Sequence, residues 1–186
     1  MMSGKQQGDF VFSTPELTHR LELILHLLEY SNHLIIVKGE HESGKTMLFR
    51  QLGRADETNL LIRNLTLDTH LSRNDIYKII VDGDANQETN ISEDDLKQWL
   101  SRCQGKQQVP SLLLDGIDIL SDQQLSELFE LIKQANEQTV LRICLFCEPE
   151  FIDRLSDLDV IQKESQSLHI IEMPLLSAKQ TEQYIH

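Results

Sequence analysis

The stretch that decides the fold is Gly39-Glu40-His41-Glu42-Ser43-Gly44-Lys45-Thr46. It matches the phosphate-binding loop pattern G-x-x-x-x-G-K-[ST] at every fixed position. The apolar run 34–37 before it predicts a buried strand, and residues 47–52 after it predict a helix. A helix in that place points its free N–H groups and its positive dipole end at an anion. We therefore expect all the residues of this loop to bind a nucleotide.

Two side chains of the loop have specific expected roles. The Lys45 ammonium can reach the β- and γ-phosphates, and the Thr46 hydroxyl can ligate Mg²⁺. A second motif, at residues 111–115, is an apolar strand that ends in Asp115. Because the C-terminal ends of parallel strands face the ligand crevice, we expect Asp115 to lie beside Thr46 and to hold the metal. The alternative is an ordinary turn, since a glycine follows Asp115.

The rest of the chain alternates between short apolar segments and amphipathic ones. The predicted strands are 33–38, 59–66, 110–115, 140–147 and 168–172. The predicted helices are 15–30, 44–53, 73–81, 92–102, 121–136 and 149–156, with a loop over 81–90. Short apolar strands separated by helices predict an α/β fold: a five-stranded parallel sheet with helices on both faces, in three layers.

Composition narrows the classes of partner. The formal net charge is −13 and the isoelectric point is near 4.9. A nucleic-acid backbone or an anionic lipid surface needs a basic face, so neither is expected as the main partner of this domain. The sequence has no apolar run of about 20 residues and no signal-peptide pattern. We therefore expect a cytoplasmic domain without a membrane segment in this chain.

The cysteines invite a redox or zinc interpretation that the pattern does not favour. Cys144 and Cys147 have C-x-x-C spacing, but they lie in an apolar run that predicts a buried strand. Residues three apart on a strand face opposite sides, and no second Cys/His pair has the spacing of a zinc site. We expect ordinary core thiols.

Two further segments carry a resemblance to a known family. They are Leu145-Phe146-Cys147-Glu148-Pro149-Glu150-Phe151 and Met173-Pro174-Leu175-Leu176-Ser177, the latter leading to Thr181, Tyr184 and Ile185. With the phosphate loop and the strand ending in Asp115, they resemble the AAA+ ATPases of the general secretion pathway A (ExeA) and pilus-biogenesis (MshM) type. DamX-like cell-division proteins share that domain. The family's corresponding motifs read like L-x-G-Q-P-E-L and P-L-S-x-x-E-T-x-x-Y-I. The resemblance spans about residues 12–186.

The resemblance implies a P-loop NTPase of the AAA+ type that binds ATP with Mg²⁺. It implies a flexible segment at 1–13, the nucleotide-binding domain at 14–176, and the start of a truncated lid at 177–186. It also implies a protein partner in a bacterial envelope complex for secretion, pilus assembly or cell division, and a homo-oligomer. The chain stops where a helical pattern begins, so we expect a longer protein, which leaves room for attachment to the cytoplasmic side of the inner membrane.

Departures from the family pattern concern hydrolysis more than binding. Family members follow the magnesium acid with a glutamate that polarises water, whereas this chain has Gly116 there and its next acid is Asp118. Glu148 replaces a polar amide, and the stretch 165–167 lacks the family's arginine. The resemblance therefore assigns the water-orienting role to Asp118 or Glu148 and predicts slow turnover. An arginine of that kind is worth about 10³–10⁵ in rate.

Two alternatives remain at this point. A degenerate, non-catalytic domain could serve as a protein-interaction scaffold, since Gly116 and the missing arginine both weaken hydrolysis. A P-loop kinase is weaker, because such enzymes close an arginine-bearing lid over the phosphates and only Arg142, Arg154 and earlier arginines are available. A GTPase is disfavoured because the sequence has no N-K-x-D segment.

Overall fold

The computed structural model describes residues 14–32, 34–55, 59–83, 90–136, 141–157 and 168–174. The strands are β1 (Leu34–Lys38), β2 (Leu60–Thr66), β3 (Val109–Asp115), β4 (Arg142–Cys147) and β5 (Leu168–Glu172). The helices are α1 (Pro15–Tyr30), α2 (Lys45–Leu52), α3 (Arg73–Asp82), α4 (Glu93–Gly105), α5 (Asp122–Asn136) and α6 (Phe151–Asp157), with a 3-10 helix η1 (Ile117–Ile119). Each predicted strand and helix is present, close to its expected bounds.

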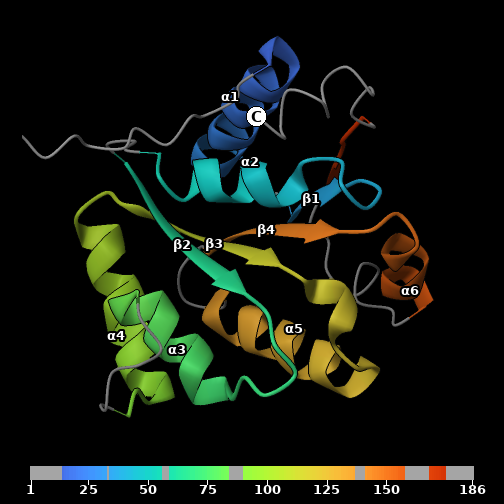
Figure 1. Cartoon of the computed structure of the whole chain (residues 1–186). Helices are drawn as coiled ribbons and strands as arrows, with labels where there is room; N and C mark the ends of the chain where they lie inside the picture. The colour runs from blue at the N-terminus through green and yellow to red at the C-terminus, as the bar shows by residue number, and fades with distance from the viewer. Residues whose placement is uncertain are drawn as a thin grey trace, which may run out of the picture.

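The strands form a single parallel sheet in the order β2-β3-β4-β1-β5 (Figure 1). Ile35 of β1 pairs with Cys144 of β4 on one side and with His169 of β5 on the other. Leu113 of β3 likewise pairs with Cys144, so β4 lies between the phosphate-loop strand and β3. The strand that precedes the phosphate loop is thus central, and the C-terminal ends of all the strands share one edge of the sheet.

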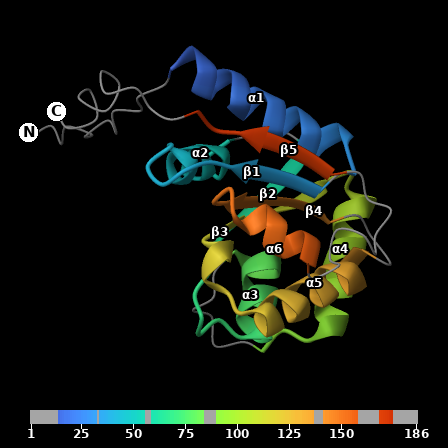
Figure 2. The ribbon, with the colours of Figure 1, turned by 90° about the vertical axis from the view of Figure 1, so that its right-hand side faces the viewer.

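Helices cover both faces of the sheet, as the sequence predicts (Figures 1 and 2). α1 and α2 lie on one face, where side chains such as Ile24 and Leu48 pack against Val37 and Phe146. α3, α4, α5 and α6 lie on the other face, around a larger apolar cluster that includes Leu112. Helices on both faces of the parallel sheet make the three-layer α/β architecture that the sequence predicts.

Local capping explains where several helices begin. Thr14 accepts a hydrogen bond from the backbone of Leu17 at 3.1 Å, and Pro15 occupies the first turn of α1. Capping boxes open α3 and α4, each formed by a serine and an aspartate three residues later. One boundary was wrong: the loop expected over 81–90 starts later, because Val81 and Asp82 still belong to α3, which ends at Gly83 with φ of 82°.

Some predictions fall outside the described residues. These are the N-terminal segment 1–13, the stretch 165–167 and the lid start at 177–186. Within the described part, no helix is both long enough and apolar enough to span a bilayer.

Candidate nucleotide-binding site

The phosphate loop connects the end of β1 to the start of α2. The backbone N–H of Gly39 donates to the Cys147 carbonyl at 3.2 Å, which ties the start of the loop to the end of β4. Gly44 caps α2 in the left-handed region, with φ of 89°, and Glu42 also has a positive φ of 64°. A left-handed non-glycine residue costs about 1–2 kcal/mol, so the loop holds Glu42 in a conformation that its own sequence does not favour.

Lys45 is turned back over its own loop. Its ammonium donates to the Gly39 carbonyl at 2.5 Å and to the Glu40 carbonyl at 2.7 Å, and the side chain is partly buried. The ammonium therefore lies across the concave side of the loop. Phosphate oxygens, which are stronger acceptors for a cation, can replace these two carbonyls. The remaining charged or titratable side chains of the loop, those of Glu40, His41 and Glu42, are exposed.

The interior of the loop contains a polar atom without a partner. The Ser43 side chain is 2% exposed, and its hydroxyl has no hydrogen-bond partner in the described structure. Leaving a buried hydroxyl unpaired costs about 1–3 kcal/mol. A Cβ at Gly39 would lie 2.5 Å from this hydroxyl, so only glycine fits at that position. A buried unpaired hydroxyl, a cation and the start of a helix together suit an anionic ligand.

The two predicted metal ligands lie side by side. The Thr46 hydroxyl donates to a carboxylate oxygen of Asp115 at 3.2 Å, although β1 and β3 are not neighbours in the sheet. The other carboxylate oxygen of Asp115 accepts from the backbone N–H of Gly116 at 3.1 Å, which fixes the orientation of the side chain. The structure thus confirms the expected juxtaposition of Thr46 and Asp115. Both side chains supply oxygen atoms, the ligands that Mg²⁺ takes.

The two acids expected to orient water also lie together. The backbone N–H of Glu148 donates to the Asp118 carboxylate at 3.0 Å, which joins the end of β4 to η1. Burial raises the pKa of Asp118 and the negative charge of Glu148 adds to this shift, while the hydrogen bond from the Glu148 N–H and the charge of Lys45 oppose it. Glu148 is exposed, and its carboxylate lies 3.8 Å from the His41 ring. The structure therefore gathers Lys45, Asp118 and Glu148 around the mouth of the loop.

Gly116 occupies a left-handed backbone conformation that favours glycine. Its φ is 78°, at the turn between β3 and η1. A side chain there would have room, since a Cβ at this position would lie 3.5 Å from its nearest neighbour, the Leu67 carbonyl oxygen. The cost is in the backbone, at about 1–2 kcal/mol for an L-residue. A glutamate at this position, as in the resembling family, would have to adopt this left-handed conformation.

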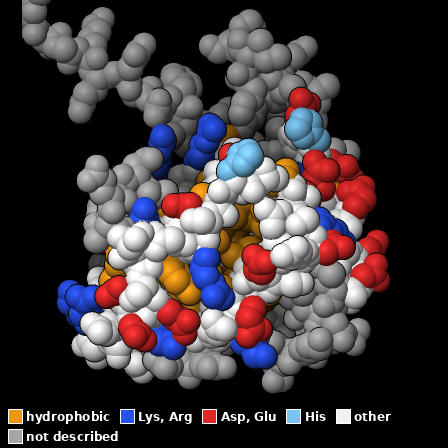
Figure 3. Space-filling view, turned by 90° about the horizontal axis from the view of Figure 1, so that it is seen from below, with side chains coloured by type: hydrophobic (Ala, Val, Ile, Leu, Met, Phe, Trp, Pro, Cys, Tyr) orange, Lys and Arg blue, Asp and Glu red, His pale blue; other side chains and the backbone are white. Residues whose placement is uncertain are grey.

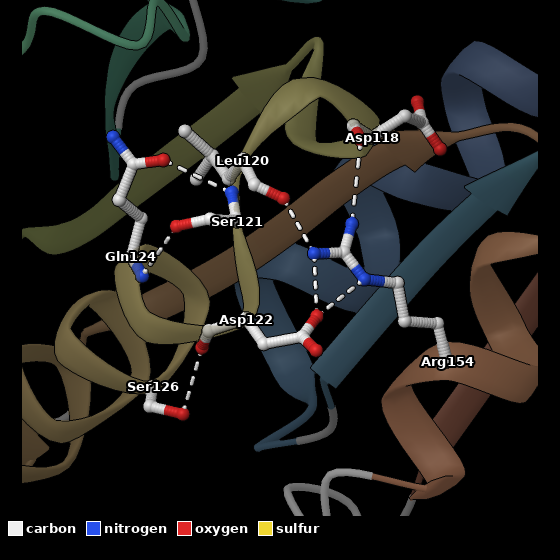
Figure 4. Close-up of polar contacts among 7 residues, drawn as sticks. All are labelled: Asp118, Leu120, Ser121, Asp122, Gln124, Ser126 and Arg154. Carbon is white, nitrogen blue, oxygen red and sulfur yellow. Dashed lines mark hydrogen bonds and ion pairs between the residues drawn. The ribbon is translucent and has the colours of Figure 1, made fainter.

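Arg154 of α6 is a site-supporting residue that the sequence reasoning missed. Its guanidinium donates to Asp122 at 2.8 Å, to the Leu120 carbonyl at 2.6 Å and to the Asp118 carbonyl at 3.4 Å (Figure 4). It also lies 5.8 Å from the centre of the Phe151 ring. Arg154 therefore holds η1, the segment that carries Asp118, against α6. The one available signal was a single base in the acidic segment 150–157.

The arginines considered for a kinase-type lid are engaged elsewhere. Arg154 contacts η1 and Asp122. Arg142 begins β4, at the edge of the sheet opposite the phosphate loop, where it hydrogen-bonds Asn32. These contacts leave both arginines in structural roles.

The C-x-x-C cysteines are core residues. Cys144 and Cys147 are free and buried, and they belong to the apolar clusters on opposite faces of the sheet. Burial raises the pKa of Cys147 to about 12, and the charge of Asp118 adds to the shift. Burial also raises the pKa of Cys144. In the described ranges, no group of three or more His, Cys, Asp or Glu side chains could hold a metal ion by itself.

This arrangement of phosphate loop, β3 acid and parallel sheet defines a nucleotide-binding module of the AAA+ class. A family described as AAA domain matches residues 28–155, which is more than half of the chain. The chain therefore belongs to the AAA domain family. No curated protein matches the sequence.

Solved structures share the fold at low sequence identity. Cdc6p from Pyrobaculum aerophilum aligns with a TM-score of 0.60 at 16% identity, covering 96% of this chain and 51% of that one. Orc1 from Aeropyrum pernix, solved in complex with DNA, aligns with a TM-score of 0.58 at 16% identity over 95% and 50%. The Bacteroides Pif1 helicase in complex with ADP-AlF3 and ssDNA aligns with a TM-score of 0.52 at 16% identity over 89% and 43%. This chain spans about half the length of these proteins or less.

Proposed function

We propose that the chain binds Mg·ATP at the loop Gly39–Thr46 and acts as a slow ATPase or a nucleotide switch. The observation that carries this proposal is the 3.2 Å contact between Thr46 and Asp115. A hydroxyl and a carboxylate at that distance can ligate the same magnesium ion. Lys45 and the N–H groups at the start of α2 would hold the phosphate oxygens. When bound, the metal ion supplies positive charge that offsets the charge on the phosphates.

Slow turnover follows from the acids around the loop. We propose that Asp118, or else Glu148, orients the attacking water, since Asp118 is anchored by the Glu148 N–H at 3.0 Å. Burial raises the pKa of Asp118, and a higher pKa makes its carboxylate a stronger proton acceptor. Glu148 brings a second negative charge to the same place, which opposes the triphosphate. The chain therefore has every group that nucleotide binding needs, but its groups for polarising water and neutralising charge during hydrolysis are less favourable.

The cellular setting is proposed from the family resemblance alone. We propose that the domain serves a secretion, pilus or cell-division complex of the bacterial envelope and works on the cytoplasmic side of the inner membrane. A homo-oligomer is part of the same proposal. The net charge of −13 supports a protein partner over nucleic acid. The DNA in the complexes of Orc1 and Pif1 belongs to those proteins, whose identity with this chain is 16%.

A non-catalytic scaffold is the second candidate, and Gly116 favours it. Its φ of 78° disfavours the glutamate that would polarise water in the resembling family. In that case the site would bind a nucleotide without turning it over, and the bound state would support a protein interaction.

Affinity and phosphate release, measured on the same preparations, separate the two candidates. The ATPase proposal predicts saturable Mg·ATP binding and a slow release of phosphate that falls at least ~10-fold in Asp118→Asn. Asp153→Asn, which changes an exposed acid of α6, is the matched control and should leave release unchanged. Binding with release at the background rate would favour the scaffold. No saturable binding would contradict the ATPase proposal.

A further inference from the structure

A hollow of about 580 Å³ opens on the face of the molecule opposite α1 and α2 (Figure 3). It lies between the loop that joins β2 to α3 and the first turns of α5. None of the phosphate-loop residues, nor Asp115, Asp118 or Glu148, lines it. Its volume falls within the range of about 300–1,000 Å³ that is typical of ligand sites. We call it the α3–α5 groove.

The floor of the α3–α5 groove is apolar. The side chains that form it include Leu67, Leu71, Ile76, Leu128 and Leu131. Figure 3 shows hydrophobic side chains at the base of the hollow, surrounded by charged ones. Leu67, Ile76, Leu128 and Leu131 keep only 2–8% of their surface exposed, so they form the apolar bottom of a hollow.

The rim of the α3–α5 groove is acidic, and its acids are not neutralised. Asp68, Glu127 and Glu130 line it, and in the described residues none of the three forms an ion pair. Their hydrogen-bond donors are neutral: Glu127, for example, accepts from the Gln123 side chain at 3.0 Å. The one base in the lining, Arg73, keeps its charge beside its neutral partner Gln134, so the three acids outnumber a single base on the rim. The rim therefore complements a cationic ligand.

The walls of the groove are held in place. The Gln124 amide on α5 donates to the Thr69 carbonyl at 3.0 Å, which ties the β2–α3 loop to the helix. Ser72 and Asp75 form the capping box that starts α3 on the same side. A preformed groove binds with a smaller entropy cost than one that must first become ordered.

We propose that the α3–α5 groove binds an amphipathic helix of a partner protein, with apolar residues on one face and Lys or Arg at its edges. The apolar floor would take residues at i, i+3 or i+4, and i+7, as in other helix-in-groove interfaces. The free acids on the rim would meet the basic residues and repel nucleic acid and anionic lipid. This inference does not rest on the nucleotide site and is tested without nucleotide.

The test uses two fluorescein-labelled helical peptides of four turns, about 14 residues each. Both have the same leucine stripe, and one has lysines where the other has glutamates. Fluorescence anisotropy should show saturable binding of the lysine peptide, and the glutamate peptide should bind at least ~10-fold more weakly, a difference of about 1.4 kcal/mol. No saturable binding, or equal affinity for both peptides, would overturn the proposal.

Two pairs of variants locate the site. Ser126→Trp fills the groove, and Ser156→Trp is its control, since both serines are exposed on helices and donate to the carbonyl four residues before, at 2.9 and 3.0 Å. Glu127→Lys reverses a rim charge, and Glu22→Lys makes the same change on α1. The two groove variants should lower the affinity for the lysine peptide at least ~5-fold, and the two control variants should leave it unchanged. Equal effects from variants and controls would show binding to the acidic surface in general and overturn the proposal.

Discussion

The backbone N–H of Glu148 donates a 3.0 Å hydrogen bond to the carboxylate of Asp118. This bond joins the end of β4 to η1 beside the phosphate loop, so two acids far apart in the sequence share one place. Burial and the charge of Glu148 raise the pKa of Asp118. The protein therefore keeps a partly buried acid near Lys45 at a cost in stability, which is typical of a functional site.

The raised pKa of Asp118 predicts that the folding stability of the protein depends on pH. Because the pKa of Asp118 is higher in the folded protein than in the unfolded chain, the folded state binds more protons between the two values, and its stability falls as pH rises through that window. Asp118→Asn keeps an oxygen acceptor for the Glu148 N–H but carries no charge. We expect it to melt at a higher temperature than the wild type at pH 7, with the difference shrinking as pH falls toward about 4. Asp153→Asn serves as the exposed control, and a difference independent of pH would contradict the assignment.

Asp115→Asn tests the metal role. The substitution keeps the size of the side chain and removes the charge that a divalent cation prefers. We expect ATP affinity to fall at least ~10-fold more in the presence of Mg²⁺ than in the presence of a chelator, measured by calorimetric titration. Equal losses under both conditions would point instead to a structural turn, since Asp115 also accepts the N–H of Gly116.

Gly116→Glu tests the backbone at the turn after β3. With φ at 78°, a side chain at this position should destabilise the protein by about 1–2 kcal/mol. For a chain of this length that corresponds to a fall in Tm of about 2–8 °C. Gly105→Glu at the end of α4 is the control, because a Cβ there meets no atom within 4 Å and φ is not positive. A fall of equal size in both variants would show that the conformation of Gly116 is not the cause.

Arg154→Ala should destabilise the protein and loosen η1. The change removes the bonds to Asp122 and to the Leu120 carbonyl, at 2.8 and 2.6 Å, and leaves these groups without their cationic donor. Hydrogen bonds to charged groups contribute about 1.5–3 kcal/mol each at most, and this guanidinium is partly exposed, so we expect a loss of about 1–3 kcal/mol in chemical denaturation. Arg102→Ala, which removes one 3.4 Å bond on α4, should cost less than ~0.5 kcal/mol. Similar losses would contradict the role given to Arg154.

The fold was predictable because local pattern and tertiary structure agree in this chain. The strands are short and mostly apolar, and Ser72 and Ser92 mark their helix starts with local bonds. The contact between Thr46 and Asp115 was also predictable, since it follows from the parallel topology and the motif positions.

Other features depend on contacts that no local pattern encodes. Arg154 binds carbonyls more than thirty residues earlier in the chain, and the sequence does not indicate which segment it meets. η1 was not predicted, because three residues are too few to show a period. The α3–α5 groove arises from the spacing between the β2–α3 loop and α5. The pattern of apolar residues in the sequence does not determine that spacing.

The measurement that tests the account most directly is a thermal-shift titration with Mg·ATP on the wild type and on Lys45→Ala. The ammonium of Lys45 donates to two carbonyls of its own loop, at 2.5 and 2.7 Å, so its removal should leave the fold intact. Lys133→Ala, an exposed lysine of α5, is the control. We predict that saturating Mg·ATP raises Tm in the wild type and in Lys133→Ala but not in Lys45→Ala. A Lys45→Ala protein stabilised as strongly as the wild type would contradict the nucleotide site.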